Sequence, residues 1–562
     1  MGWNTHASGT RDPPEVRNWH IHLIAVVASM SALAMGYDTA VIGGTMALES
    51  FIRDFGWEGV DKTTRDTIQG NIVSAFQAGC FFGALLSFPI AEKFGRRIAI
   101  LCASLVFLLG ATLMTASRGS LNLIYGGRAI AGLGIGSSSL VVPVYIAEVA
   151  PPSIRGRLVG IFEIASQGGG MLGFWINYAT DQTISQSAQA QWIIPLALQL
   201  VPGVGLFFGM LLFCPESPRW LARGDDFEGA ARVLARVRGL PADHDYVARE
   251  MAEIRAQVEE RSTLHRSKRE QARKLLQRGV RNRVAIGVSL MFLQSFTGVN
   301  IITYYAPRIF ATLGVQGTSL KLFSTGFYGI AKTLGMITFT FVVIERVGRR
   351  KGLVWGAALG CIPMWYIGGY VMRADPEAAA AAGAVTRDAW GYLAMVCVYV
   401  NGFIICATWQ GITWTYASEI FPLDIRMLCV ALTTAVTWLG SFIIARFTPY
   451  MISDLGYGAY FFFGSILVSM GVWAFFFVPE TKGKLPSIVL VSSCPDFVHI
   501  TDLVLALGVM LEQMDALFAK STVKVVWAQI RGKPVLPEDT VATTATRDSK
   551  EEMVEEIESK GP

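Results

Sequence analysis

The chain has 562 residues, of which 52% are hydrophobic and 16% are charged, and its mean hydropathy is +0.43. A soluble protein of this length needs more charged side chains to cover its surface, so the composition indicates a polytopic membrane protein. The formal net charge of +5 reflects loops rich in Lys and Arg, as the positive-inside rule expects, and does not indicate nucleic-acid binding.

Residues 1–20 contain Arg11, Asp12, Glu15 and Arg17 and are too polar for a signal peptide, so we expect a cytoplasmic N-terminal segment. Apolar runs long enough to cross a bilayer as helices follow at 21–48, 68–91, 98–117, 121–147, 157–180 and 192–214. A second set follows at 284–311, 322–344, 352–373, 391–415, 427–451 and 457–478. This pattern predicts an all-α membrane protein with 12 transmembrane helices in two six-helix bundles, 21–214 and 284–478.

The segment between the bundles, 215–283, contains sixteen Lys and Arg residues and eleven acidic residues. We expect a cytoplasmic linker of short amphipathic helices, because apolar residues such as Val233 and Val237 recur at helical spacing. If each apolar run crosses the membrane once, both termini lie on the same side as this linker. The tail, 479–562, is then cytoplasmic and ends in a polar, acidic stretch.

Three charged motifs occur once in each half, at offsets of 253, 271 and 264 residues. The first copies are Glu92-Lys93-Phe94-Gly95-Arg96-Arg97, Tyr145-Ile146-Ala147-Glu148 with Arg155, and Pro215-Glu216-Ser217. The second copies are Glu345-Arg346-Val347-Gly348-Arg349-Arg350, Tyr416-Ala417-Ser418-Glu419 with Arg426, and Pro479-Glu480-Thr481. Three motifs that agree on one duplication, in an apolar chain of two similar halves, are typical of secondary transporters.

The ordered motifs carry a resemblance that covers about 21–484. Besides the repeated motifs they are Gly36-Tyr37-Asp38-Thr39-Ala40-Val41-Ile42-Gly43-Gly44, Gly126-Gly127-Arg128, Pro215 to Trp220, Gly298-Val299-Asn300 and Pro479 to Gly483. Together they resemble the sugar porter family of the major facilitator superfamily. Phe421 to Arg426 and Gly173 to Tyr178 are most similar to filamentous-fungal hexose transporters. The resemblance implies two bundles that move by alternating access in the plasma membrane.

Residues 485–509 interrupt this resemblance. Family members run from Pro-Glu-Thr-Lys-Gly almost directly into a helix of the type that begins here at Leu511. Removing 485–509 restores the usual order, so we interpret the segment as a translated, unspliced intron. The alternative is a thirteenth span at 488–510, which Pro495 and Asp496 make too polar to insert easily.

Charged residues within the apolar runs are candidates for function, because an unpaired charge in a bilayer is costly. Asp38 lies in the first run and Arg128 in the fourth. In proton-coupled relatives the matching pair opens on protonation, whereas facilitative relatives usually carry Asn in place of the Asp. The resemblance therefore implies proton symport. The alternative is a structural ion pair that orients two helices.

Polar residues of the seventh run predict a solute site. Gln294, Thr297, Asn300 and Tyr304 fall within an arc of about 120° if this run is one continuous helix. Such a stripe lines a cavity or a polar interface, where solute hydroxyls that lose water need new hydrogen bonds. In the family, the Gln and Asn of this helix contact sugar hydroxyls. The usual second Gln is Ser295 here, which leaves the solute open.

Two further spans contribute candidates. Glu163 and Gln167 lie one turn apart in the fifth run, and Glu163 matches a sugar-binding Gln of many relatives. Glu163 either binds hydroxyls, takes part in proton transfer, or is a structural buried acid. Trp414 in the tenth run matches the family's tryptophan that stacks on the pyranose ring. Thr333 replaces a frequent Asn of the eighth run, which is a second departure from the pattern.

The repeated motif charges predict a cytoplasmic gate network. Its first-half members are Glu92, Arg96, Arg97, Glu148, Arg155 and Glu216. Its second-half members are Glu345, Arg349, Arg350, Glu419, Arg426 and Glu480. In the family such networks hold the halves together in the outward-open state and break as the halves rock. Topology signals alone explain the arginines but not the Glu residues at fixed spacing.

The sequence predicts import of a monosaccharide, most simply a hexose such as glucose, with proton symport. Alternatives are a non-transporting glucose sensor and a facilitative sugar or quinate-type carrier. No nucleotide-binding loop is present, and the eight cysteines have no paired spacing. We therefore expect no enzymatic activity, no cofactor and no metal. The expected partners are the monosaccharide, the proton and the lipid bilayer.

Overall fold

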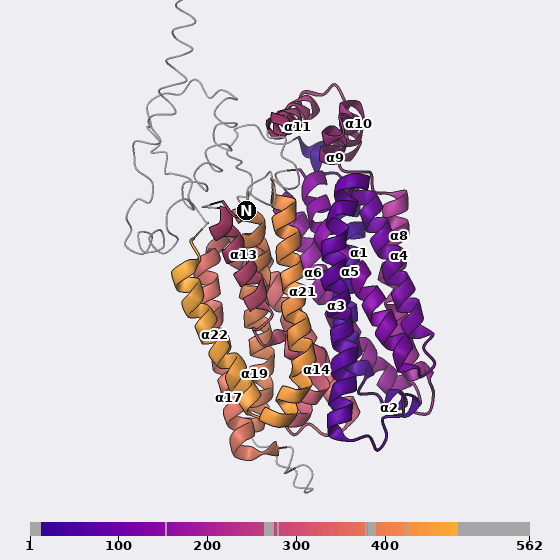
Figure 1. Cartoon of the computed structure of the whole chain (residues 1–562), viewed down its shortest axis with the longest axis vertical. Helices are drawn as coiled ribbons and strands as arrows, with labels where there is room; N and C mark the ends of the chain where they lie inside the picture. The colour runs from indigo at the N-terminus through magenta and orange to yellow at the C-terminus, as the bar shows by residue number, and fades with distance from the viewer. Residues whose placement is uncertain are drawn as a thin grey trace, which may run out of the picture.

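The computed structural model describes residues 13–151, 154–263, 275–277, 280–376, 379, 389–421 and 425–480, and their secondary structure is helical (Figure 1). Within these residues, 11 helical segments are long and apolar enough to cross a membrane. The remaining expected span is α6 (Arg155–Thr183), with 29 residues. It contains the buried polar residues Ser166, Gln167 and Asn177. The prediction of an all-α membrane protein built from two bundles is confirmed.

The first half begins with η1 (Pro14–Arg17) and ends at α8. Its long helices are α1 (Trp19–Thr45), α3 (Lys62–Phe94), α4 (Arg96–Thr115), α5 (Leu121–Val149), α6, and the pair α7 (Ala190–Leu198) and α8 (Leu200–Leu212). A short helix, α2 (Glu49–Asp54), follows α1. Helix α1 packs on α6, and α5 packs on both α3 and α4. These pairs form the core of the first bundle.

The second half contains more irregular helices. They are α13 (Val280–Gln294), α14 (Val299–Thr312), α15 (Thr318–Thr338), α16 (Ile344–Arg346), α17 (Arg349–Ala374), α19 (Ala389–Ile405), α20 (Gly411–Ile420), α21 (Arg426–Tyr450) and α22 (Gly458–Phe477). Three of them continue through π-helical turns, which are η2 (Phe339–Val343), η3 (Cys406–Gln410) and η4 (Met451–Leu455). Single π turns inside helices are frequent at functional sites.

The seventh apolar run does not form the continuous helix that the sequence predicted. Helix α13 ends at Gln294, and α14 begins at Val299 after Gly298, whose φ is +84°. A left-handed residue cannot continue a right-handed helix, so the chain changes direction there. The prediction that Gln294, Thr297, Asn300 and Tyr304 share one arc of a single helix is therefore wrong.

The linker contains the short helices that the sequence predicted. They are α9 (Pro218–Arg223), α10 (Phe227–Arg238) and α11 (Asp245–Thr263), and they lie at one end of the molecule (Figure 1). Ala230, Leu234 and Val247 are buried together between them. We call this end the linker side and the other end, where α2 lies, the opposite side. Asn18 joins the start of α1 to the linker by donating a hydrogen bond to the Val237 carbonyl at 2.9 Å.

The two halves meet along several pairs of helices. Helix α3 packs on α21, α6 on α15, and α1 on α14. The last pair approaches closely, because a Cβ on Gly43 would lie only 2.3 Å from the carbonyl oxygen of Tyr304. Gly43 is therefore required for this contact between the halves.

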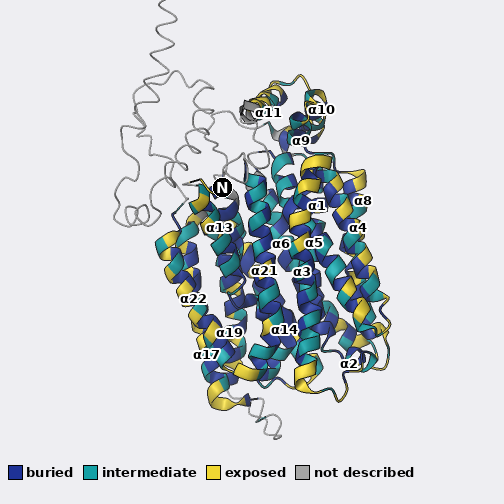
Figure 2. Ribbon diagram, in the orientation of Figure 1, coloured by how far each residue is buried: buried dark blue, intermediate teal, exposed yellow. Residues whose placement is uncertain are grey.

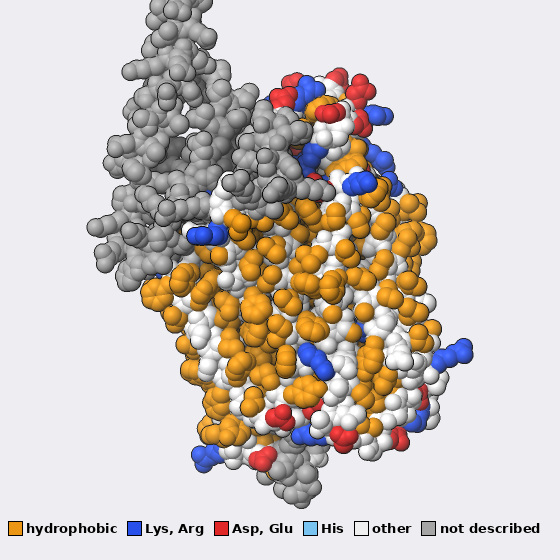
Figure 3. Space-filling view, in the orientation of Figure 1, with side chains coloured by type: hydrophobic (Ala, Val, Ile, Leu, Met, Phe, Trp, Pro, Cys, Tyr) orange, Lys and Arg blue, Asp and Glu red, His pale blue; other side chains and the backbone are white. Residues whose placement is uncertain are grey.

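The outer surface is that of a membrane protein. Exposed residues lie on the outside of the bundles (Figure 2), and hydrophobic side chains cover the middle of the visible face, while most charged side chains gather at its two ends (Figure 3). Large exposed apolar residues include Leu86, Phe208, Trp355 and Val472. An apolar belt between two charged ends is expected for a surface that faces lipid. The expected N-terminal segment up to residue 12 and the tail from residue 481, with the segment 485–509, lie outside the described residues.

Candidate functional site

Asp38 of α1 and Arg128 of α5 form an ion pair in the interior of the first half. Arg128 Nη1 lies 2.7 Å from Asp38 Oδ1, and both side chains are fully buried. The same Nη1 donates to the Asp38 carbonyl at 3.3 Å, and Nε donates to the Ile72 carbonyl of α3 at 3.2 Å. The contacts of this pair thus connect α1, α3 and α5 of the first half.

The surroundings satisfy only some of the polar atoms of this ion pair. The Arg128 guanidinium lies 4.5 Å from the centre of the Phe76 ring, which stabilises the cation. In the described structure, Asp38 Oδ2 and Arg128 Nη2 are buried without a hydrogen-bond partner. Buried ion pairs are stable only when their remaining polar atoms are also satisfied. Protonation of Asp38 would remove the strongest contact of Arg128 and would weaken the link between the helices.

The break between α13 and α14 gathers the predicted polar residues in a different way from a helical stripe. Thr297 Oγ1 donates to the Gln294 carbonyl at 2.9 Å, and Asn300 Nδ2 donates to the Ser295 carbonyl at 3.3 Å. These bonds satisfy backbone groups that the break leaves without helical partners. Gln294 Oε1 is buried without a partner in the described structure. The break therefore presents amide groups that are able to bind a polyhydroxylated solute.

The structure adds a residue that sequence reasoning missed. Gln77 of α3 is fully buried, and both of its amide atoms have no partner within the described structure. It lies beside Tyr304 of α14, which is also close to Ser441 of α21. Gln77 therefore brings a buried amide from the first half next to Tyr304 of the second. A Gln inside the apolar run 68–91 was the available signal.

Glu163 and Gln167 lie on α6, in the first half. Gln167 is buried, and Glu163 forms no ion pair with a described residue. Ile164, next to Glu163, packs against the hydrophobic core of the second half. This stretch of α6 therefore faces the interface between the halves, as a solute site requires.

Two tryptophans of the tenth apolar run have different surroundings. Trp414 of α20 is partly buried and packs against the core of the second half. Trp409 of η3 is fully buried, and its Nε1 donates to the Leu353 carbonyl at 2.9 Å. Trp409 is thus fixed inside the bundle, whereas Trp414 keeps part of its ring free for contact.

A buried lysine is a second residue that sequence reasoning missed. Lys332 of α15 is buried, and its Nζ donates to Thr303 Oγ1 of α14 at 3.0 Å. Its position inside an apolar run was a sufficient signal, since a membrane-embedded charge is a functional candidate by default.

The first-half motif charges form a cluster on the linker side. Arg96 Nε lies 3.1 Å from Glu148 Oε2, and Arg96 Nη2 lies 3.6 Å from Glu92 Oε1. Glu216 accepts hydrogen bonds from the backbone N–H groups of Arg96 and Arg97 at 2.9 and 3.1 Å. Burial raises the pKa of the Glu216 carboxyl, while these N–H groups act in the opposite direction. The cluster fastens the start of α4 to the linker.

The second-half motif charges repeat this geometry. Arg349 Nη2 lies 2.7 Å from Glu419 Oε1, and Glu480 accepts from the backbone N–H groups of Arg349 and Arg350 at 2.8 and 3.1 Å. Tyr145 and Tyr416 also correspond, because they donate to the carbonyls of Pro215 and Pro479. The motifs that are repeated in the sequence therefore make corresponding contacts in the two halves.

Other predicted members of the gate network are placed less completely. Arg426 donates to the Phe421 carbonyl at 3.3 Å, and the side chains of Arg155 and Glu345 lie outside the described part. The contacts described above join each cluster to its own half. The sequence prediction that the clusters hold the two halves together stays a prediction, which concerns another conformation.

Ionic contacts do join the two halves on the opposite side. Arg308 of α14 lies 2.6 Å from Asp66 of α3, and it donates to Ser453 Oγ at 2.6 Å. Ser453 also donates to Asp66. Arg446 of α21 donates to the Thr67 carbonyl at 3.2 Å. We call these five residues the opposite-side cluster, and sequence reasoning did not identify it because its members come from distant segments.

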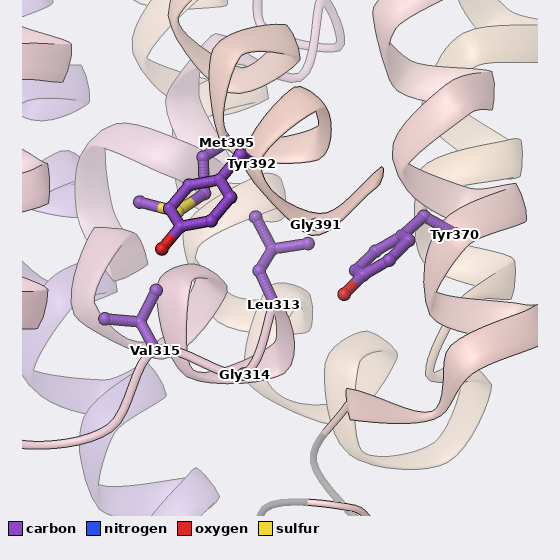
Figure 4. Close-up of a pocket in the computed structure, with 7 residues that line it drawn as sticks. All are labelled: Leu313, Gly314, Val315, Tyr370, Gly391, Tyr392 and Met395. Atoms are coloured by element: carbon purple, nitrogen blue, oxygen red, sulfur yellow. The ribbon is translucent and has the colours of Figure 1, made fainter. Parts of the chain in front are cut away.

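A small pocket lies elsewhere in the second half (Figure 4). It is lined by Leu313, Gly314, Val315, Tyr370, Gly391, Tyr392 and Met395. No predicted site residue lines it, and its walls come from the turn after α14 and from α17 and α19. This pocket is therefore separate from the interface between the halves.

Comparisons with known proteins agree with this geometry. The chain matches the family described as "Sugar (and other) transporter" over residues 24–485. It is 42% identical to the quinate permease of Emericella nidulans over 476 residues, which are 84% of this chain and 88% of that protein. It is 38% identical to a probable quinate permease of Aspergillus clavatus over 553 residues, 98% of this chain and 95% of that protein.

The fold is similar to that of the xylose transporter XylE from E. coli in a partially occluded inward-open conformation. The TM-score is 0.68 at 25% identity, and the match covers 83% of this chain and 100% of that one. The proton:xylose symporter XylE, in a structure bound to 6-bromo-6-deoxy-D-glucose, matches with a TM-score of 0.68 at 26% identity. This match covers 83% of this chain and 97% of that one. Motifs, fold and relatives agree, and the chain belongs to the sugar transporter family of the major facilitator superfamily, whose members are multi-pass membrane transporters and not enzymes.

Proposed function

We propose that the protein imports a cyclic polyhydroxylated acid of the quinate class. The observation that carries this proposal is the 42% identity to a quinate permease over most of both chains. The residues at the interface of the halves support it, because Gln77, Gln294 and Asn300 offer amide groups to hydroxyls that leave water. Trp414 offers an aromatic face to the ring.

We also propose that proton entry drives this import through Asp38 and Arg128. Their pair is buried and incompletely satisfied, so a proton on Asp38 changes the contacts between α1 and α5. The proton:xylose symporter XylE has the same fold. The geometry itself supports a pair that responds to protonation, which is what coupling requires.

The orientation follows from the charges of the linker. Its excess of Lys and Arg favours the cytoplasm, so the linker side and both termini are cytoplasmic in this proposal, and the membrane is the plasma membrane. The opposite-side cluster then closes the external entrance, and the structure is an inward-facing state. In the outward-open state the two linker-side clusters would approach each other and hold the halves together.

The test is uptake in a yeast strain that lacks its own hexose and quinate carriers. Cells that express the full chain should accumulate labelled quinate, and the uptake should raise the pH of a weakly buffered medium. Empty-vector cells provide the baseline. Uptake of quinate that equals this baseline, with the protein present at the surface, would show that the proposal is wrong.

A neutral hexose such as glucose is the second candidate. The specific observation in its favour is the set Gln294, Asn300 and Trp414, which matches the positions that bind sugars in the family. Labelled glucose in the same cells decides between the two solutes. Uptake of either solute also excludes a sensor that does not transport.

A further inference from the structure

A buried ammonium group in α15 has no carboxylate partner among the described residues. Lys332 is 8% exposed, and its Nζ donates to Thr303 Oγ1 at 3.0 Å. The Nζ lies 5.7 Å from the centre of the Tyr328 ring. A hydroxyl and an aromatic face stabilise a cation less than a carboxylate does. The charge of Lys332 is therefore incompletely compensated in this conformation.

The fully buried arginines of the described residues have carboxylate partners. Three fully buried arginines each have a carboxylate partner, in the pairs Arg96–Glu148, Arg128–Asp38 and Arg238–Glu250. Each of these three buried guanidinium groups is thus paired with a carboxylate of the protein itself. Lys332 differs from this pattern. A charge embedded in the membrane is a candidate functional site by default, and the missing carboxylate points to a ligand that supplies one.

Lys332 lies close to the predicted solute residues. Its hydrogen-bond partner Thr303 directly precedes Tyr304 on α14. Helix α15, which carries Lys332, packs on α6 of the first half, which carries Glu163. Glu163 belongs to α6 in the first half, so Lys332 stands on the part of the second half that approaches the interface. A solute held at the break between α13 and α14 would be a near neighbour of this ammonium group.

We infer that Lys332 binds the carboxylate of the transported acid, an inference that rests on the proposed function. A cyclic polyhydroxylated acid has one group that needs a cation and several that need hydrogen-bond donors and acceptors. Lys332 supplies the cation, and Thr303 positions its Nζ. Gln294 and Asn300 serve the hydroxyls. A neutral hexose has no group for Lys332, which makes this residue a determinant of specificity.

The test compares quinate with its neutral carboxamide, which keeps the ring and the hydroxyls. Binding of each compound to the purified full-length protein is measured by calorimetry, and uptake is measured in proteoliposomes. The variant Lys332→Met keeps the length of the side chain and removes the charge. The matched control is Lys321→Met, a partly exposed lysine near the start of the same helix.

Lys332→Met should weaken quinate binding by about 30-fold or more, as expected for loss of one partner of a buried charge pair. Its affinity for the carboxamide should stay within about threefold of the wild type, which also shows that the variant is folded. Lys321→Met should bind both compounds like the wild type. Thr303→Val, which keeps the ammonium group, should weaken quinate binding by about three- to tenfold and leave carboxamide binding unchanged.

Two negative results have different meanings. If wild type binds quinate and Lys332→Met keeps the wild-type ratio of quinate to carboxamide affinity, Lys332 does not bind the carboxylate, and the proposed function stands. If the wild type neither binds nor transports quinate, the proposed function fails and the role of Lys332 fails with it. If Lys332→Met is unfolded, a Thr303→Val variant with the wild-type ratio overturns the inference.

Discussion

The Asp38–Arg128 pair shows how much depends on single buried polar side chains in this protein. Asp38 and Arg128 are joined at 2.7 Å, and one atom of each is left without a partner in the described structure. If Asp38 takes up a proton, the ion pair is replaced by a neutral acid beside an uncompensated Arg128. The two states differ in free energy because a buried charge without a partner is costly. The energetic difference between these two states is what a transporter can couple to movement.

Asp38→Asn should abolish accumulation of solute against a gradient while exchange of labelled solute across proteoliposomes continues. The amide keeps the shape of the side chain but cannot take up or release the proton. Accumulation and medium alkalinisation are measured in cells, and exchange is measured in vesicles without a pH gradient. The control is Asp61→Asn, because Asp61 is an exposed helix cap whose role Asn also fulfils. Proton-coupled accumulation that persists in Asp38→Asn would refute the coupling role.

Asn300→Ala and Trp414→Ala should each weaken solute affinity by about tenfold, because a lost hydrogen bond or ring contact costs roughly 1–2 kcal/mol. Surface expression should not change. The control is Trp409→Phe, which removes the bond to the Leu353 carbonyl inside the bundle. It should lower thermal stability and leave affinity unchanged. Wild-type affinity in both Asn300→Ala and Trp414→Ala would place the solute elsewhere.

Sequence reasoning predicted the Asp38–Arg128 pair because both charges stand out in apolar runs and match a family motif. It did not identify Gln77, Arg308 or Lys332, although each is also a polar residue in an apolar run. The difference lies in packing. A polar residue inside an apolar run could have been noticed for each of them, but the distant side chains that they contact are not recorded in any local pattern.

At the element scale, the break in the seventh apolar run has the clearest consequence. Gly298 has a φ of +84°, and a Cβ there would lie 2.4 Å from Met364 Cε. The turn therefore needs glycine for its backbone and for its space. Hydrophobic periodicity could not show this break, because apolar residues continue through it.

Gly298→Ala should lower the free energy of unfolding by about 1–2 kcal/mol, the usual cost of a left-handed non-glycine residue. Thermal unfolding of the purified protein in detergent measures the change. Gly369→Ala is the matched control, since Gly369 lies inside helix α17 with open space around it, and alanine favours a helix. Equal melting temperatures for Gly298→Ala and the wild type would show that the backbone does not adopt this turn.

In the whole molecule, the described ion pair between the two halves lies on the opposite side. Asp66 and Arg308 join the halves on the opposite side. The linker-side contacts of Arg96 and Arg349, in contrast, join each cluster to its own half. The sequence predicted the two bundles, the linker and the repeated motifs, since these depend on composition and order. It could not predict on which side an ion pair joins the halves, because Asp66 and Arg308 come from distant segments.

Asp66→Asn should shift the equilibrium toward the conformation that is open on the opposite side, by about tenfold for a loss of 1.4 kcal/mol. Reaction of a cysteine placed in the opened entrance with a membrane-impermeant reagent measures the shift. Arg53→Met is the control, because Arg53 pairs with Asp54 on the same side within one half. Unchanged reactivity in Asp66→Asn would mean that the pair does not hold the entrance closed.

Helix α14 is only 14 residues long, about 21 Å at 1.5 Å per residue, and it carries Asn300 near one end and Arg308 near the other. The helix is kinked at Tyr305, between these two residues, and thermodynamic reciprocity applies to any two sites that influence each other through it. If solute at Asn300 changes the strength of the contact between Arg308 and Asp66 by some factor, weakening that contact must change solute affinity by the same factor. A substitution in the opposite-side cluster would thus change the affinity for the solute without contacting it.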